Sequence, residues 1–180
     1  MKLLSLLFLT IFLGKGCDAE QKQDIESAVI EYTATTRGFY QQIVVQNQKF
    51  TVTKDRNGNE KLIQQSISKA DWKDIIEAFQ DVDLEGFKDL KGPTEKRFYD
   101  GAAIGNIKVI YKGKTYETNG FDHGNPPLEI EKLVNKITDG TWKYYHFQSS
   151  QLMTIENYKE GKLDGNRKVY YKDGTIAADT

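Results

Sequence analysis

The sequence predicts an α+β fold, an antiparallel β-meander with two helices packed on one face, followed by a C-terminal β-hairpin extension. Runs of β-branched and aromatic residues between glycine- and asparagine-containing breaks predict the strands. Two stretches carry apolar residues at i, i+3, i+4 and i+7, the spacing of one buried helix face. We therefore expect an α+β body at residues 28–139, with helices covering one side of a sheet, and an extension at residues 140–180.

Four strands are expected at the start of the body. They fall at residues 28–36, 39–45, 49–54 and 61–67. Gly38 breaks the chain between the first two, and residues 46–48 turn the chain into the third. Residues 55–58 end in Asn57 and Gly58, which readily adopt the positive φ of a tight hairpin turn. The pattern predicts a four-stranded meander.

The first helix is expected at residues 68–79. Ser68 can cap the amides at its start, and Asp71 stands three residues later, where a capping box has its acid. The apolar stripe consists of Trp72, Ile75, Ile76 and Phe79. This stripe predicts that one face of the helix packs on the sheet.

A strand pair and a second helix complete the body. Strands are expected at residues 107–111 and 115–121, joined by a turn at Gly113. Asn125 is the expected helix cap, with a proline at the first helical position. The second apolar stripe consists of Ile130, Leu133, Val134 and Ile137, and Asp139 with Gly140 ends this helix.

The N-terminus reads as an export signal. Lys2 precedes an apolar run at residues 3–13, and Gly14 and Gly16 stand at positions −3 and −1 before Cys17. The run is too short for a membrane-spanning helix, which needs roughly 20 residues. The segment resembles the lipobox of bacterial lipoproteins, which implies a signal peptide at residues 1–16, lipid on Cys17 and a tether at residues 17–27.

Cys17 is the only cysteine, so no disulfide can form within the chain. Three fates are open for it: acylation, an unmodified N-terminus of a secreted protein, or a buried structural cysteine. An exposed lone thiol is a liability in an oxidising compartment, which favours acylation. The expected location is the bacterial cell envelope, in the outer membrane, in a periplasm-facing membrane or at the cell surface, and the lipid on Cys17 makes the membrane a partner.

Composition excludes some classes of function. After removal of residues 1–16, 23 basic residues stand against 26 acidic ones. Nucleic-acid binding needs a clustered basic surface, so no nucleic-acid partner is expected. No phosphate-binding glycine loop is present and no spacing of ligands predicts a metal site, so no cofactor is expected.

Part of the body resembles uncharacterised lipoprotein domains of bacterial envelopes, which share the order strands, helix, strand pair, helix. The resemblance covers residues 30–137. It is carried by residues 37–40 (RGFY), 93–103 (PTEKRFYDGAA) and 121–127 (FDHGNPP). It implies a fold and a compartment and supplies no activity.

The extension resembles bacterial MORN repeats. Gly140 with Tyr145 matches Gly165 with Tyr170 at a spacing of 25 residues, and the match is best at residues 158–174. Hairpin repeats of this kind need about three copies to stand alone, and fewer than two are present, so we expect the extension to dock on the body. The expected packing residues are Trp142, Tyr145, Tyr158 and Tyr170. The alternative is an aromatic platform that binds a ligand.

Five residues form the expected ligand or partner surface: Arg97, Tyr99, Asp100, Asp122 and His123. A triad would need Asp122 to orient His123, but adjacent residues of an extended chain point in opposite directions. No nucleophile motif accompanies them. We therefore expect a non-catalytic protein-binding or structural module. The alternatives are a periplasmic immunity or inhibitor protein, and a hydrolase or ligand-binding protein with a pocket near Arg97, Asp100 and His123.

Overall fold

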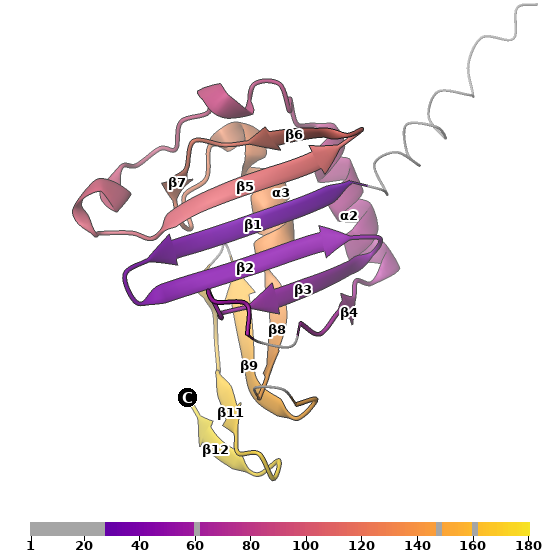
Figure 1. The fold of residues 1–180 in the computed structure, drawn as a ribbon, viewed down its shortest axis with the longest axis vertical. Coiled ribbons are helices and arrows are strands. Elements are labelled where there is room, and N and C mark those ends of the chain that lie inside the picture. The colour runs from indigo at the N-terminus through magenta and orange to yellow at the C-terminus, as the bar shows by residue number, and fades with distance from the viewer. Residues whose placement is uncertain (1–27, 60–61, 147–148, 160–161) are drawn as a thin grey trace, which may run out of the picture.

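A computed structural model describes residues 28–59, 62–146, 149–159 and 162–180 of the chain. The described residues form two antiparallel β-sheets and two α-helices, which confirms a mixed α+β fold (Figure 1). The expected signal peptide at residues 1–16 and the tether with Cys17 lie outside the described residues. No helix within the described part is long and apolar enough to cross a membrane.

The larger sheet has seven strands in the order β4-β3-β2-β1-β5-β6, with β7 also paired to β5. Its strands are β1 (Val29–Thr36), β2 (Phe39–Gln46), β3 (Lys49–Thr53), β4 (Gln65–Ser66), β5 (Ile104–Tyr111), β6 (Lys114–Glu117) and β7 (Phe121–Asp122). The central strand β1 pairs with β2 on one side and with β5 on the other. The other strands of the predicted meander and the predicted strand pair therefore lie on opposite sides of β1.

The fourth strand is much shorter than expected. The carboxylate of Asp55 accepts hydrogen bonds from the backbone amides of Asn57 and Asn59, and this local loop replaces the predicted tight hairpin. Of the described residues in this stretch, only Gln65 and Ser66 pair with β3. The strand predicted at residues 61–67 is therefore shorter than expected: residue 61 lies outside the described residues, and strand β4 covers Gln65–Ser66.

Both helices occur where their apolar stripes predicted them. Helix α2 (Lys69–Gln80) has Ser68 as its N-cap, whose hydroxyl accepts from the Asp71 amide at 3.1 Å. Helix α3 (Leu128–Thr138) begins later than expected, with extended Pro127 as its N-cap and no side-chain cap. Pro126 precedes a proline and is thereby disfavoured from helical geometry, so Asn125 cannot be the cap. Asn125 instead forms a β-bridge with Asp122.

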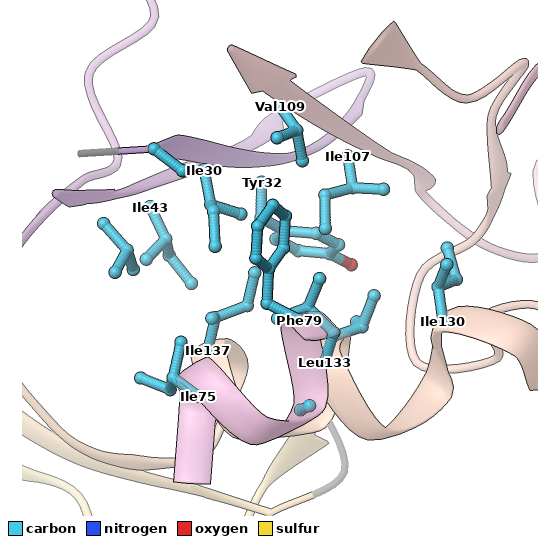
Figure 2. Packing of buried hydrophobic residues seen from close by; sticks show 14 of the residues in the cluster. Ile30, Tyr32, Ile43, Ile75, Phe79, Ile107, Val109, Ile130, Leu133 and Ile137 are labelled. Carbon is cyan, nitrogen blue, oxygen red and sulfur yellow. The ribbon is translucent and has the colours of Figure 1, made fainter. Parts of the chain in front are cut away.

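The core lies between the sheet and the two helices. Figure 1 shows both helices on the same face of the larger sheet. Ile30, Tyr32, Ile43 and Ile107 of the sheet point toward Phe79 and Leu133 of the helices (Figure 2). Every residue of both predicted helix stripes is buried, so the prediction of each inward face is confirmed.

The C-terminal strands form a second sheet of their own. They are β8 (Gly140–Tyr145), β9 (Leu152–Lys159), β10 (Lys162–Leu163), β11 (Lys168–Tyr170) and β12 (Ile176–Asp179). Strand β9 pairs with β8 on one side and with β10 and β11 on the other, and β12 pairs with β11. The relation of these hairpins to MORN repeats stays a prediction.

The second sheet packs on the body through β8. The ring of Trp142 meets Phe50 of β3 edge to face, with 4.8 Å between the ring centroids. Trp142 and Tyr144 are buried, whereas Tyr145, Tyr158 and Tyr170 are only half-buried. Tyr144, which was not among the expected packing residues, is buried on the same face as Trp142 because side chains alternate along a strand.

Candidate functional site

The candidate site is the segment 94–101, which we call the aromatic turn. It contains the 3₁₀ helix η2 (Lys96–Tyr99) and is held by the carboxylate of Asp122 at the end of β7. Asp122 accepts from the hydroxyl of Thr94 at 2.6 Å and from the backbone amides of Lys96 and Arg97 at 2.6 and 3.0 Å. The guanidinium of Arg97 adds a fourth contact at 3.2 Å.

Asp122 is a fully buried charge whose hydrogen-bonding capacity is used by the turn. Its exposed fraction is 0%. Burial acts to raise the pKa of Asp122, but the hydrogen bonds from Thr94, Arg97 and Lys96 outweigh burial and lower the pKa to about 2. The side chain is therefore ionised at neutral pH, and it fixes the backbone of the aromatic turn.

The turn presents two aromatic side chains to solvent. Phe98 is 72% exposed and Tyr99 is 71% exposed. The Arg97 guanidinium lies over the Phe98 ring, 4.2 Å from its centroid. A Cβ atom on Gly101 would lie 3.0 Å from the Tyr99 ring, so a larger residue there would push this ring aside. The buried carboxylate thus holds the guanidinium, and the guanidinium supports an exposed ring.

His123 belongs to a different contact. Its Nδ1 atom lies 2.7 Å from the hydroxyl of Tyr32 in β1, and its ring also packs near Phe39. Burial, with a smaller effect of Lys162, lowers the pKa of His123. Burial also raises the pKa of Tyr32. Both side chains are therefore predominantly neutral at pH 7, and they join β1 to the segment after β7.

The structure brings together only part of the predicted surface. Arg97 and Asp122 form an ion pair, while Tyr99 and Asp100 are exposed on the same turn. His123 faces Tyr32 instead. Sequence reasoning did not select Thr94 and Phe98, the first bonded to Asp122 and the second the most exposed aromatic ring of the turn. Two adjacent aromatic residues in the sequence RFYDG could have drawn attention to Phe98. No sequence pattern indicates that Thr94 lies beside Asp122.

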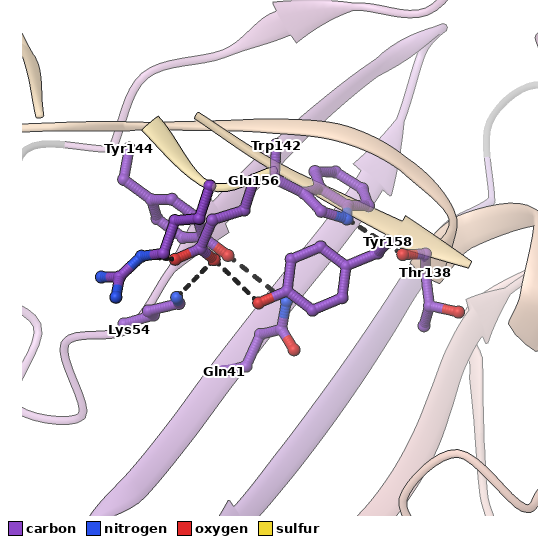
Figure 3. Close-up of polar contacts among 8 residues, drawn as sticks. Gln41, Lys54, Thr138, Trp142, Tyr144, Glu156 and Tyr158 are labelled. Atoms are coloured by element: carbon purple, nitrogen blue, oxygen red, sulfur yellow. Dashed lines mark hydrogen bonds and ion pairs between the residues drawn. The ribbon is translucent and has the colours of Figure 1, made fainter. Parts of the chain in front are cut away.

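A second polar cluster joins the body to the C-terminal sheet (Figure 3). Glu156 of β9 is 3% exposed, and its carboxylate contacts Lys54 at 2.6 Å and Arg167 at 2.9 Å. The hydroxyl of Tyr158 donates to it at 2.8 Å. Burial acts to raise the pKa of Glu156, but these partners, chiefly Lys54, lower it overall. Because Lys54 belongs to the body and Glu156 to the second sheet, the pair crosses the junction.

The same junction contains a tyrosine whose polar atom is bonded to the body. Gln41 of β2 donates to the hydroxyl of Tyr144 at 3.5 Å, and the Lys54 ammonium lies 4.2 Å from the centroid of the Tyr144 ring. Burial raises the pKa of Tyr144, and Tyr158 and Glu156 add to that effect. The sequence analysis did not select Glu156. The available signal was that this charged residue stands two positions after Thr154, on the same face of an alternating strand.

The aromatic turn combines a fully hydrogen-bonded carboxylate with aromatic rings that are exposed to solvent. Asp122 already accepts from four donor groups, and the exposed aromatic groups are the rings of Phe98 and Tyr99. Within the described ranges, no three His, Cys, Asp or Glu side chains are placed to hold a metal ion. Compared with known protein families, curated proteins and solved structures, the chain shows no match.

Proposed function

We propose that the protein is a non-catalytic protein-binding module of the bacterial cell envelope, attached to the membrane by lipid on Cys17. The aromatic turn is its contact surface. The observation that carries this proposal is the pair of adjacent aromatic side chains, each more than 70% exposed, on a turn fixed by a fully buried carboxylate.

Exposed aromatic residues on a rigid turn suit protein recognition. Tyrosine and other large aromatic side chains bury much apolar area at an interface for few rotatable bonds. A partner then loses little free energy in ordering the turn, because Asp122 and Arg97 already hold it. The Arg97 charge is balanced by Asp122, which favours a protein partner over an anionic surface.

The hydrolase alternative receives less support from the geometry. It would need Arg97, Asp100 and His123 to face one cleft. Asp100 is exposed at the end of the turn, while His123 bonds to Tyr32 on β1. The half-buried imidazole is predominantly neutral, and its hydrogen-bond partner is the Tyr32 hydroxyl, where a triad would have a carboxylate.

Photo-crosslinking tests the contact surface. A benzophenone amino acid is placed at Phe98 or Tyr99 in the full-length chain, in the cells that produce it, and irradiated. We expect one discrete protein adduct from both positions, because the rings contact the partner directly. The matched control is Tyr171, an aromatic residue of the second sheet that is 59% exposed. Adducts from Phe98 and Tyr99 no stronger than those from Tyr171 would refute the proposal.

Detergent partitioning tests the anchor. We expect the wild type to enter the detergent phase with an intact mass increased by acyl chains, and Cys17→Ser to stay in the aqueous phase. The reason is that only the Cys17 thiolate can carry the lipid in a chain with one cysteine. A wild-type chain without added mass would contradict the lipid anchor. The contact surface is tested separately, by the crosslinking experiment.

A further inference from the structure

A cavity of about 570 Å³ opens where α2, α3 and the start of β8 meet the end of the larger sheet. This volume lies within the range of small-molecule sites, roughly 300–1,000 Å³. The body contributes the lining residues of both helices and of β2 to β4, and the second sheet contributes Gly140, Thr141 and Trp142. The cavity shares no lining residue with the aromatic turn.

The floor of the cavity is apolar and aromatic. It is formed by Val45, Phe50, Ile67, Ile75, Ile137 and Trp142. The indole nitrogen of Trp142 donates to the Thr138 carbonyl at 2.9 Å, so the polar atom of this ring is already bonded. Phe50 is half-buried and offers ring surface to an occupant, whereas Trp142, only 4% exposed, closes the base of the cavity. Aromatic surface of this kind favours an apolar group or a cation.

The two lysines of the lining are paired with acids that lie outside it. Lys136 contacts Asp74 of α2 at 2.6 Å, and Lys132 contacts Asp81 at 3.2 Å. The pKa of Lys136 is raised chiefly by its hydrogen bond with Asp74, with further contributions from Asp71 and Asp139. These contributions show that several carboxylates surround one ammonium group at this end of the helices.

The lining also contains two carboxylates of its own, Asp71 and Asp139. Asp71 accepts from the Ser68 hydroxyl at 2.6 Å, and that same hydroxyl caps the helix. Each lysine of the lining is paired with an acid outside it, whereas the carboxylate of Asp71 is bonded to the neutral hydroxyl of Ser68. The Asp71 carboxylate therefore favours a positive charge at this edge of the cavity.

We propose that this cavity binds a small molecule with an apolar, preferably aromatic, body and a cationic amine head. The body lies against the Phe50 ring, and the amine faces Asp71 at the edge of the cavity. This binding site is independent of the proposed protein contact at the aromatic turn, since the two surfaces lie on different elements.

Three probes of similar size separate the charge preference from simple apolar burial. They are 2-phenylethylamine, 2-phenylethanol and 3-phenylpropanoate, titrated into the full-length chain while amide chemical shifts are followed. We expect the amine to bind at least about tenfold more tightly than the carboxylate, equivalent to about 1.4 kcal/mol, with the alcohol between them. Shift changes should centre on Ser66, Thr141 and Trp142.

Two variants locate the site. Asp71→Asn retains an acceptor for the Ser68 hydroxyl, and we expect it to remove most of the preference for the amine. Glu77→Gln on the exposed side of α2 is the matched control, because it removes one acid that does not line the cavity, and it should leave the preference unchanged. Ser66→Trp, at an exposed position of the rim, should weaken all three probes by obstructing the cavity.

Three outcomes of these titrations would contradict the proposed amine site. Equal affinity for the three probes, tighter binding of the carboxylate, or an amine affinity that Ser66→Trp does not reduce would each overturn the proposal. If Asp71→Asn proves unfolded, the probe order in the wild type and the Ser66→Trp titration still decide it.

Discussion

Asp122 is a charged side chain buried in the body of the fold, and its surroundings explain why burial is tolerated. Two backbone amides, one hydroxyl and one guanidinium donate to its two oxygens. A buried carboxylate without such donors would be neutral or strongly destabilising. The charge therefore has a defined role: it fixes the geometry of the segment that carries Phe98 and Tyr99.

Replacement of this carboxylate should loosen the aromatic turn and change the pH dependence of stability. We expect Asp122→Asn to lower the free energy of unfolding by about 1–3 kcal/mol, because at least one buried donor loses its acceptor. In the wild type the pKa of Asp122 falls from its ordinary value near 4 to about 2. Its ionised form thus stabilises the fold above about pH 4, and this contribution is lost as the pH falls toward 2.

Urea unfolding at several pH values measures this effect. The wild type should lose stability between about pH 4 and pH 2, and Asp122→Asn should lose less over the same interval. Asp100→Asn is the matched control, because it removes an exposed carboxylate from the same turn and should leave stability at pH 7 within about 0.5 kcal/mol of the wild type. Parallel pH curves for wild type and Asp122→Asn would show that the Asp122 charge does not stabilise the fold.

At the scale of elements, the beginning of α2 shows how a local signal places a helix. Ser68 caps the Asp71 amide, and Ile67 just before it is buried against the core. The first turn has its donors satisfied locally, and the apolar stripe then directs the helix onto the sheet. At α3, by contrast, Pro126 and Pro127 delay the start, and no side chain caps the first turn.

Removal of the Ser68 hydroxyl should destabilise the protein by about 1 kcal/mol, the usual effect of losing a serine N-cap. Ser68→Ala tests this by urea unfolding followed by circular dichroism. Ser66→Ala, two residues earlier on exposed β4, serves as the control and should have little effect. Equal stabilities of the two variants would mean that the hydrogen bond to Asp71 does not contribute.

For the whole molecule, the important feature is the junction between the two sheets. Apolar contact through Phe50 and Trp142 lies beside the polar contact of Lys54 and Glu156. Gln41 and Tyr144 add a third contact across the same junction. Body and second sheet should therefore unfold as one cooperative unit.

Trp142→Ala tests this cooperativity. We expect a loss of about 3–5 kcal/mol, because the change removes a large buried ring from a packed junction. The chain then keeps one tryptophan, Trp72 on α2, whose fluorescence reports on the body alone. The urea midpoint seen by Trp72 should fall. Tyr171→Ala, an exposed change in the second sheet, should leave that midpoint in place. An unchanged midpoint in Trp142→Ala would show that the two sheets fold independently.

Local signals predicted much of the fold. Alternation and turn residues predicted β1, β2 and β3 to within one or two residues, and both helix faces were predicted from four apolar residues each. The fourth strand and the start of α3 were predicted less well. The Asp55 carboxylate forms a local loop by accepting from nearby backbone amides, and Pro127 disfavours helical geometry at Pro126. A pattern of hydrophobic residues shows neither effect.

The candidate site was predicted by residue type and not by arrangement. Arg97 and Asp122 were both predicted to belong to the site, and they form an ion pair. The same prediction included His123, which contacts Tyr32 instead. Thr94 is 28 positions from Asp122, and Glu156 is 102 positions from Lys54. Contacts across such separations follow from strand order, which composition and spacing do not specify.

The sequence by itself determined the mixed α+β class, the positions of the helices and their buried faces, because 3.6- and 2-residue periodicities are local properties of the chain. The tertiary structure alone decided that β5 lies beside β1, that the C-terminal strands form a separate sheet, and that Asp122 fixes the aromatic turn. The physical reason is that these outcomes depend on pairing and burial between distant segments. Each is selected by the free energy of the whole fold and not by its own stretch of sequence.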